Sequence, residues 1–234
     1  MKELRFFATI VLSVFLFSSC KNSPESDKAV TTETKEVPAE NASGKTFIIQ
    51  PAESKIEWVG TKVSGYHVGE VPVKSGELTI RNNGIAGGTF VLDLGNITVT
   101  GPEGSKKAAD DKLTAHLKTA DFFEVEKYPT GTFEITGITP FTEAVTEADD
   151  PRQSVISKYK VINPTHKVSG NLTLKGITKN IEFPAKITVS GNSAEAIAKF
   201  NIDRTLWNIV YPGKTDDLIR KEVHLGISIK ATSL

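Results

Sequence analysis

The sequence is poor in sulfur, with one cysteine and one methionine in 234 residues. A single cysteine, Cys20, excludes an intrachain disulfide and is too little for a cysteine-based zinc site or an iron–sulfur cluster. The four histidines lack the HExxH spacing, and no P-loop, GxGxxG or GxSxG motif is present. We therefore expect no enzymatic activity and no required metal or cofactor.

An excess of charge of either sign is also missing. Twenty-eight basic and 28 acidic residues leave a net charge of zero, whereas a nucleic-acid-binding domain is usually basic. Hydrophobic residues make up 38% and charged residues 24%, which excludes a disordered chain and a polytopic membrane protein. We expect no nucleic acid among the partners.

The sequence contains no apolar run long enough to cross a bilayer. Its most hydrophobic stretch, Phe6 to Phe17, is about a dozen residues long and follows Lys2 and Arg5. This pattern is typical of a secretory signal peptide, here residues 1–19.

The end of this stretch, small residues followed by Cys20, resembles the lipobox of bacterial lipoproteins. The resemblance implies cleavage before Cys20, acylation of Cys20 and attachment to a membrane. Lys21, where inner-membrane lipoproteins carry aspartate, implies the outer membrane, with the protein facing the periplasm and surface exposure left open. The alternative is an ordinary signal peptide with a chance cysteine.

Residues 20–45 contain almost no large apolar side chains, so they cannot bury enough surface to offset the entropy of ordering. We interpret them as a flexible, lipid-anchored tether. Residues 46–234 then form one folded domain.

From residue 46 onward, apolar and polar residues alternate with a period of two, which indicates half-buried antiparallel strands. Closure into a barrel would remove the sheet edges. We predict an all-β fold, a soluble antiparallel lipocalin-like barrel of about eight strands with one helical segment near 108–117; a membrane-spanning barrel is the less favoured alternative. The strands are expected near residues 46–50, 54–63, 70–81, 85–99, 130–139, 155–174, 179–190, 194–203 and 222–232.

Four segments carry a family resemblance: HLKTADFF (116–123), YPTGTF (128–133), GNLTLKGIT (170–178) and IDRTLW (202–207). In this order they resemble the YceI-like family of bacterial envelope proteins, over residues 46–234. The resemblance implies a lipocalin-shaped barrel whose apolar bore takes an extended lipid chain, with no general enzymatic activity. Many members carry Arg-Asp where this chain has Leu113-Thr114, so the head-group preference is in doubt.

Inward-facing positions and the family motifs together predict the ligand contacts. We expect them at Phe90, Leu92, His116, Phe122, Phe123, Phe133, Ile135, Leu172, Leu174, Phe183, Phe200, Arg204 and Trp207. Small inward residues such as Gly170, Ala196 and Ala198 would leave space for the chain.

Each polar or aromatic motif also has a structural interpretation. Phe122 and Phe123 would plug one barrel end. His116 would bond a loop carbonyl rather than a head group. Arg204 would pair with an acidic side chain or clamp a loop rather than bind phosphate, Trp207 would seal the barrel, and the alternation turns His224 outward.

Three functions follow from these predictions. The first is a lipid-anchored binding protein for an amphiphilic lipid, a polyisoprenoid, an isoprenoid quinone or a similar molecule. The second is a structural or interaction lipoprotein with a filled barrel and no ligand. The third is a stress-linked enzyme or quinone carrier. The sequence leaves the ligand, its head group and the oligomeric state open.

Overall fold

The computed structural model describes residues 23–143 and 158–233. The predicted signal peptide and Cys20 therefore lie outside the described residues. Thirteen strands, one α-helix and four short 3-10 helices are present in the described part. They are β1 (Val30–Thr32), η1 (Ala39–Ala42), β2 (Lys45–Ile49), η2 (Pro51–Glu53), β3 (Lys55–Lys62), β4 (Gly65–Val71), β5 (Val73–Arg81), β6 (Gly84–Asp93), η3 (Leu94–Asn96), β7 (Thr98–Gly101), α1 (Lys107–Leu117), β8 (Thr130–Pro140), β9 (His166–Leu174), β10 (Ile177–Ser190), β11 (Ser193–Asp203), η4 (Arg204–Trp207), β12 (Gly213–Lys214) and β13 (Asp217–Ser233).

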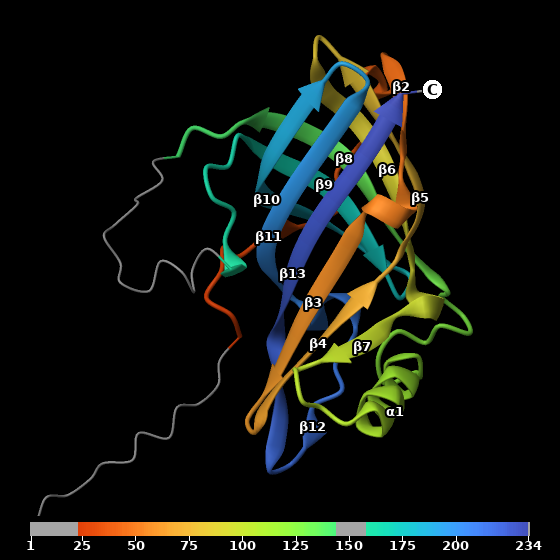
Figure 1. Cartoon of the computed structure of the whole chain (residues 1–234), viewed down its shortest axis with the longest axis vertical. Helices are drawn as coiled ribbons and strands as arrows, with labels where there is room; N and C mark the ends of the chain where they lie inside the picture. Colours follow the sequence, from red (N-terminus) through yellow and green to blue (C-terminus); the bar gives the residue numbers. More distant parts are fainter. Residues whose placement is uncertain (1–22, 144–157, 234) are drawn as a thin grey trace, which may run out of the picture.

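Eight antiparallel strands close the barrel, in the order β10-β9-β8-β6-β5-β2-β13-β11 and back to β10 (Figure 1). This confirms the predicted fold class. The predicted helix at 108–117 is α1, one residue longer at its N-terminal end.

Three further strands extend the barrel at one end. β3, β4 and β7 continue the paths of β2, β5 and β6 after short interruptions at η2, Pro72 and η3. The 17-residue strand β13 spans both parts, pairing with β2 near its end and with β3 over residues 219–228. We call the end formed by β3, β4, β7, β12 and α1 the lower end, as it lies in Figure 1. The break between β2 and β3 agrees with the separate strands expected at 46–50 and 54–63, whereas the breaks between β4 and β5 and between β6 and β7 were missed because so short an interruption leaves the period-two pattern nearly intact.

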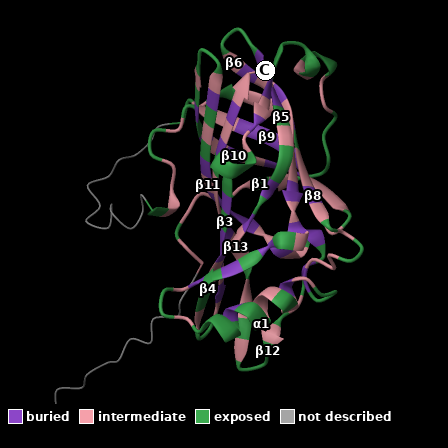
Figure 2. Ribbon diagram, turned by 45° about the vertical axis from the view of Figure 1, so that its right-hand side comes forward, coloured by how far each residue is buried: buried purple, intermediate pink, exposed green. Residues whose placement is uncertain are grey.

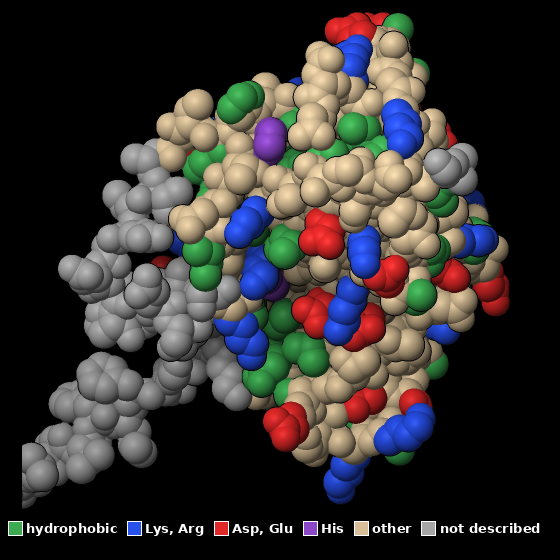
Figure 3. All heavy atoms as spheres, turned by 45° about the horizontal axis from the view of Figure 1, so that its top comes forward, with side chains coloured by type: hydrophobic (Ala, Val, Ile, Leu, Met, Phe, Trp, Pro, Cys, Tyr) green, Lys and Arg blue, Asp and Glu red, His purple; other side chains and the backbone are tan. Residues whose placement is uncertain are grey.

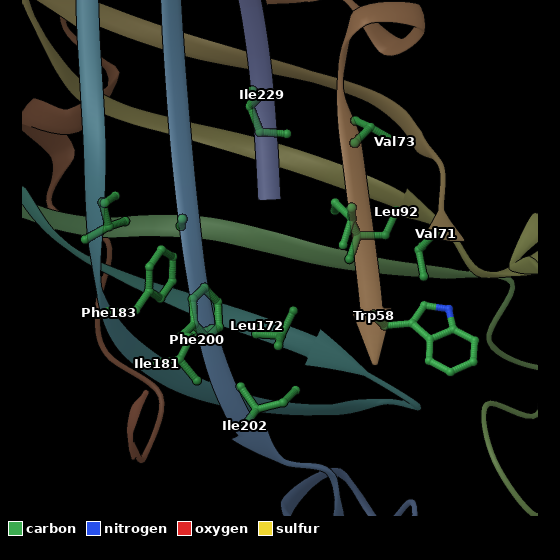
Figure 4. Close-up of a cluster of buried hydrophobic side chains, with 14 of the residues drawn as sticks. Trp58, Val71, Val73, Leu92, Leu172, Ile181, Phe183, Phe200, Ile202 and Ile229 are labelled. Atoms are coloured by element: carbon green, nitrogen blue, oxygen red, sulfur yellow. The ribbon is translucent and has the colours of Figure 1, made fainter. Parts of the chain in front are cut away.

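The core lies inside the barrel, where alternate residues of each strand meet (Figures 2 and 4). Phe200 on β11 is fully buried and Phe183 on β10 is nearly so, and both point toward Leu172 on β9 (Figure 4). Complete burial of such a side chain stabilises the fold by about 1.5–3 kcal/mol. None of the helices in the described ranges is both long and apolar enough to cross a bilayer.

The N-terminal segment lies along the outside of the barrel, which the interpretation of 20–45 as a tether did not foresee. β1 pairs with β10, through Val30 opposite Glu182 and Thr32 opposite Asn180. A few residues earlier, the backbone of Asp27 and Ala29 bonds Asn201 on β11 (2.7 and 2.9 Å). We call residues 23–44 the strap.

The strap fills a seam in the barrel wall. β10 and β11 pair only between residues 185–190 and 193–198, and below that point they diverge. Beyond that point the backbone of the strap forms hydrogen bonds with the free edge of β10, through β1, and with the free edge of β11, at Asn201. Backbone hydrogen bonds to an open edge need no apolar side chains, so composition alone could not reveal them.

A candidate ligand-binding cavity in two chambers

The barrel interior contains two neighbouring cavities of unequal size. The upper chamber measures about 100 Å³ and its lining is entirely apolar. The lower chamber measures about 840 Å³ and lies between the barrel, α1 and the loop after β11. Ile56, Leu92, Leu172 and Leu225 line both chambers, so the two adjoin one another.

A row of phenylalanines explains why the upper chamber is small. The ring centroids of Phe90 and Phe133 lie 6.0 Å apart, those of Phe133 and Phe183 5.9 Å, and those of Phe183 and Phe200 4.1 Å. A Cβ on Gly170 would lie 2.2 Å from the ring of Phe133. The expectation that Gly170 leaves room for a ligand is therefore wrong, because Phe133 already occupies that room. Ala196 and Ala198 do line the upper chamber.

The lower chamber combines an apolar wall with polar groups at its lower end. Its volume falls within the range of about 300–1,000 Å³ that is typical of small-molecule sites. Leu94, Leu113 and Ile209 are among its apolar residues, while Lys62, Lys112 and Lys214 bring positive charge. An amphiphile with its head group toward the lower end would match this distribution.

Among the residues that the structure describes, Asp217 is the one carboxylate that lines the lower chamber, and it is already paired. Its Oδ2 lies 2.5 Å from Nζ of Lys62, and its Oδ1 accepts a 2.9 Å hydrogen bond from the backbone N–H of Ser64. The hydrogen bond from Lys62 is the largest cause that lowers the pKa of Asp217 to about 2. The carboxylate therefore remains ionised at neutral pH and neutralises Lys62, which leaves Lys112 and Lys214 to balance a ligand's charge.

Two buried nitrogens near this chamber have no hydrogen-bond partner in the described part of the chain, Nε1 of Trp58 and Nδ1 of His67. Both residues line the lower chamber. Burial, and then the charge of Lys62, lower the pKa of His67, so its neutral form is favoured. An unsatisfied buried polar atom costs about 1–3 kcal/mol. Neither residue was among the predicted ligand contacts; their inward positions on β3 and β4 were the available signal.

An aromatic cluster borders the chamber where α1 ends. The ring of His116 meets Phe122 edge-on at 5.1 Å and Tyr211 at 5.0 Å. Nε2 of His116 lies 2.7 Å from Oδ2 of Asp121. The predicted bond from His116 to a loop carbonyl is therefore wrong, since the neighbouring carboxylate is the stronger partner.

Arg204 clamps the loop that closes the lower end. Its guanidinium donates to the carbonyls of Arg220 (3.1 Å), Tyr211 (2.9 Å) and Ile209. The loop-clamp prediction is thus confirmed, and within the described residues no ion pair joins Arg204 to an acidic side chain. Asp203 accepts from the backbone of Thr205, and Asp121 binds His116. Burial lowers the pKa of Arg204.

Trp207 is fully buried and donates from Nε1 to the carbonyl of Leu172 at 2.9 Å. It lines neither chamber, so in this structure it packs the wall and does not face a ligand.

His224 has the predicted outward orientation, yet it is not exposed. It is buried, with Nδ1 2.9 Å from Oδ1 of Asn201 and Tyr159 edge-on at 5.1 Å. The strap covers this face, since Asn201 also donates to the carbonyl of Pro24. Burial lowers the pKa of His224 to about 4.

The family model of the YceI-like domain matches residues 47–231 of this chain. The chain belongs to the YceI-like domain family. UPF0312 protein ECA1782 of Pectobacterium atrosepticum is 29% identical over 110 residues, 45% of this chain, and the match spans just under half of that relative's length.

Two solved structures share the YceI-like fold of this chain. BcnA of Burkholderia cenocepacia superposes with a TM-score of 0.56 at 17% identity, covering 79% of this chain and 99% of BcnA. A polyisoprenoid binding domain from Saccharophagus degradans, implicated in plant cell wall breakdown, gives a TM-score of 0.55 at 13% identity, with 80% and 98% covered. At these identities the likeness shows the fold.

Within this YceI-like barrel, twelve of the thirteen predicted contact residues line a chamber. The upper chamber has Phe90, Phe133, Ile135, Phe183 and Phe200; the lower has His116, Phe122, Phe123, Leu174 and Arg204; Leu92 and Leu172 belong to both. Their contact with a ligand stays a prediction. In the described ranges, no three His, Cys, Asp or Glu side chains are grouped as a metal site would require.

Proposed function

We propose that this protein binds the apolar chain of an amphiphilic lipid in its lower chamber and holds the head group near Lys112 and Lys214. The observation that carries the proposal is a cavity of about 840 Å³ with an apolar wall and polar groups concentrated at one end. Burial contributes roughly 25 cal/mol per Å² of apolar surface, so the hydrocarbon chain supplies most of the affinity.

A structural neighbour supports a polyisoprenoid as the ligand class, and an isoprenoid quinone is an alternative because it carries the same kind of apolar chain. One structural neighbour, from Saccharophagus degradans, is a polyisoprenoid binding domain. A binding role, and not catalysis, also agrees with the absence of a recognisable catalytic motif in the sequence.

The packed upper half favours a second candidate, a structural lipoprotein without ligand. The phenylalanine row leaves only about 100 Å³ there, so a filled barrel describes that half well. The two candidates differ in the lower chamber, which the second requires to stay empty.

We further propose that Cys20 is acylated and that the protein is an outer-membrane lipoprotein facing the periplasm. The lipobox-like residues before Cys20 and the following Lys21 support this location. The mass of the mature N-terminal peptide tests it: a diacyl- or triacyl-cysteine at residue 20 is expected, and an unmodified mature terminus would contradict it.

A matched pair of glycine substitutions tests the ligand site. A Cβ on Gly60, which lines the lower chamber, meets only the ring of Trp58 at 3.5 Å or more, so Gly60→Phe places a ring in the chamber. Gly137 has open space around its Cβ and lines neither chamber, so Gly137→Phe is the control. We expect Gly60→Phe to weaken binding of fluorescent geranylgeraniol at least about tenfold, or 1.4 kcal/mol.

The companion measurement is the mass of lipid extracted from protein purified from its own envelope. A stoichiometric isoprenoid is expected with the unsubstituted chain and with Gly137→Phe, but not with Gly60→Phe. No extracted lipid together with no probe binding would favour the structural candidate.

A further inference from the structure

Exposed apolar side chains gather at the lower end of the molecule. Eight large apolar residues of the described chain are exposed, and five of them lie on three segments that wall the lower chamber. We call these five the apolar collar: Val63, Tyr66, Leu206, Val210 and Leu218.

The collar alternates with the chamber lining along the chain. Val210 is 56% exposed between Ile209 and Tyr211, which both line the chamber. Leu218, 50% exposed, stands in the same way between Asp217 and Ile219. The same segments therefore present one row of side chains to the chamber and the next to solvent.

Backbone contacts hold these segments together. The N–H of Val63 donates to the carbonyl of Leu218 at 3.2 Å, and Leu218 pairs with Gly213, three residues after Val210. Arg204 ties the carbonyls of Ile209 and Arg220 into the same end. The apolar side chains thus sit on a clamped frame around the chamber.

The wall of the barrel is different in character. Lys167 on β9 forms ion pairs with Glu143 at 2.5 Å and with Glu182 on β10 at 3.7 Å. Figure 3 shows acidic and basic side chains interspersed over the face that it presents. A paired, charged wall suits water, whereas a group of exposed apolar side chains marks an interaction surface.

The strap brings the N-terminus to this end. Oγ of Ser23 donates to the carbonyl of Glu222 at 3.0 Å and lies 3.1 Å from Oγ1 of Thr61, two residues before Val63. Cys20 precedes Ser23 by three residues, a reach of at most about 11 Å. Acyl chains on Cys20 would thus enter a bilayer close to the collar.

We propose that the apolar collar docks on the lipid bilayer that holds the anchor, so that the lower chamber faces the membrane and exchanges its ligand with it directly. The exchange step rests on the proposed function, whereas the docking does not require a ligand. Amphipathic surfaces with apolar side chains and nearby lysines, here Lys214 and Lys221, bind the interface of membranes that contain anionic lipids.

Depth-dependent fluorescence quenching tests the docking. The full chain, purified from membranes and reconstituted in phosphatidylethanolamine–phosphatidylglycerol vesicles, would carry Val210→Trp or Leu218→Trp. The control is Ile197→Trp on the outer wall, where Ile197 is 42% exposed. Trp58 and Trp207 are buried, so the unsubstituted chain supplies the background.

Lipids brominated in the upper acyl chain are expected to quench both collar tryptophans and to leave the Ile197→Trp signal unchanged. Equal quenching at all three positions, or at none, overturns the docking, because the collar would then have no privileged contact with the bilayer.

A charge variant tests the exchange. The pair Val210→Glu and Leu218→Glu is expected to slow transfer of fluorescent geranylgeraniol from vesicles at least about tenfold, since it removes apolar contact and repels anionic lipid. Ile197→Glu should leave the rate unchanged. Affinity for the same probe dispersed in vesicle-free buffer should be equal in all three proteins.

Transfer from vesicles and affinity in vesicle-free buffer together distinguish failure of the collar inference from failure of the proposed binding function. Unchanged transfer in the charge variant, with normal affinity in buffer, overturns the collar inference and leaves the binding function intact. Absence of binding in buffer by the unsubstituted chain overturns the proposed function and the exchange step, while the quenching result still decides the docking.

Discussion

At the scale of single residues, the polar groups that the barrel buries are the most informative. His224 lies under the strap, against Asn201 and Tyr159, and burial lowers its pKa from 6.5 to about 4. The charge of Lys199 adds to the shift, and that of Glu57 opposes it. In the unfolded chain the imidazole would titrate at its ordinary pKa, so the two states bind protons differently between these values.

The first prediction concerns acid stability. Between pH 6.5 and about 4 the unfolded chain binds more protons at His224 than the folded chain, so the free energy of unfolding falls as the pH falls. With about 1.4 kcal/mol per pKa unit, the loss approaches about 3 kcal/mol by pH 4. Urea unfolding at pH 7, 5.5 and 4.5 should show this slope.

His224→Gln is the control for this prediction, because it keeps a polar side chain and removes the titration. Its slope over the same window should be smaller, with the remainder coming in part from His67, whose pKa is also lowered. Identical slopes in the two proteins would rule out His224 as the source.

Residues also show where sequence patterns stop being informative. The alternation placed His224 on the outer face correctly, but burial depends on what covers that face. Arg204 was recognisable within its motif, yet its carbonyl partners lie on a loop whose path only the folded chain defines. Eight of the twelve chamber residues lie on strands and were predictable because inward positions follow from the period of two, whereas His116, Phe122, Phe123 and Arg204 were predicted from the family motifs.

At the scale of elements, one asparagine side chain attaches the strap just beyond β1, in place of a strand partner. Oδ1 of Asn171 accepts from the backbone N–H of Lys35 at 3.1 Å, and its Nδ2 donates to the carbonyl of Lys35 at 2.7 Å. Asn171 also accepts from Asn180, which is fully buried on the outer face of β10. A buried polar network of this kind stabilises only if all its members stay paired.

The second prediction is that Asn171→Ala loosens the strap. It removes both bonds to Lys35 and leaves one buried N–H of Asn180 without Asn171, a loss of about 1–3 kcal/mol in local opening free energy. Hydrogen exchange at the backbone amides of Thr31 and Lys35 should accelerate accordingly.

Lys179→Ala provides the comparison, because Lys179 reaches the strap only through an exposed ion pair with Glu33 at 2.7 Å. Such a pair contributes about 0–1 kcal/mol, so exchange should change little. Equal acceleration in both variants would mean that the asparagine is not the principal attachment.

The strap was beyond sequence reasoning for a physical reason. Its residues are polar and its stability comes from backbone pairing with strands about 150 positions away, as in Val30 with Glu182. The breaks that produce β4 and β7 as separate strands were missed for a related reason, since they follow from the path of the sheet and not from local preference.

At the scale of the whole molecule, the bore is divided into an open lower half and a packed upper half. The division predicts a limit on the length of apolar chain that binds without rearrangement. Chains that fill the lower chamber of about 840 Å³ should bind well. Further isoprene units should add little affinity, because they fit only if the phenylalanine side chains of the upper chamber move.

The third prediction is that Phe183→Ala shifts this limit. Removing one ring from the row enlarges the upper chamber next to Leu172, which both chambers share. Relative affinity for a C40 over a C20 isoprenoid should rise severalfold, while the stability of the apo protein falls by about 3–5 kcal/mol.

Phe47→Ala matches the loss of a buried ring, since Phe47 is 1% exposed and lines neither chamber. It should lower stability by a similar amount and leave the C40 to C20 ratio unchanged. A ratio that moves equally in both variants would show that softening of the core, and not the connection of the chambers, sets the preference.

The strap also determines how the molecule carries mechanical load. If the N-terminus is fixed in a membrane, any drag on the barrel passes first through the bonds of Ser23, Asp27 and Ala29 to β13 and β11. Those bonds join one short segment to a seam, whereas the barrel strands are joined along their length. Tension on the anchor would therefore detach the strap from the seam between β10 and β11 before it unfolds the barrel, so the wall would open first at this seam.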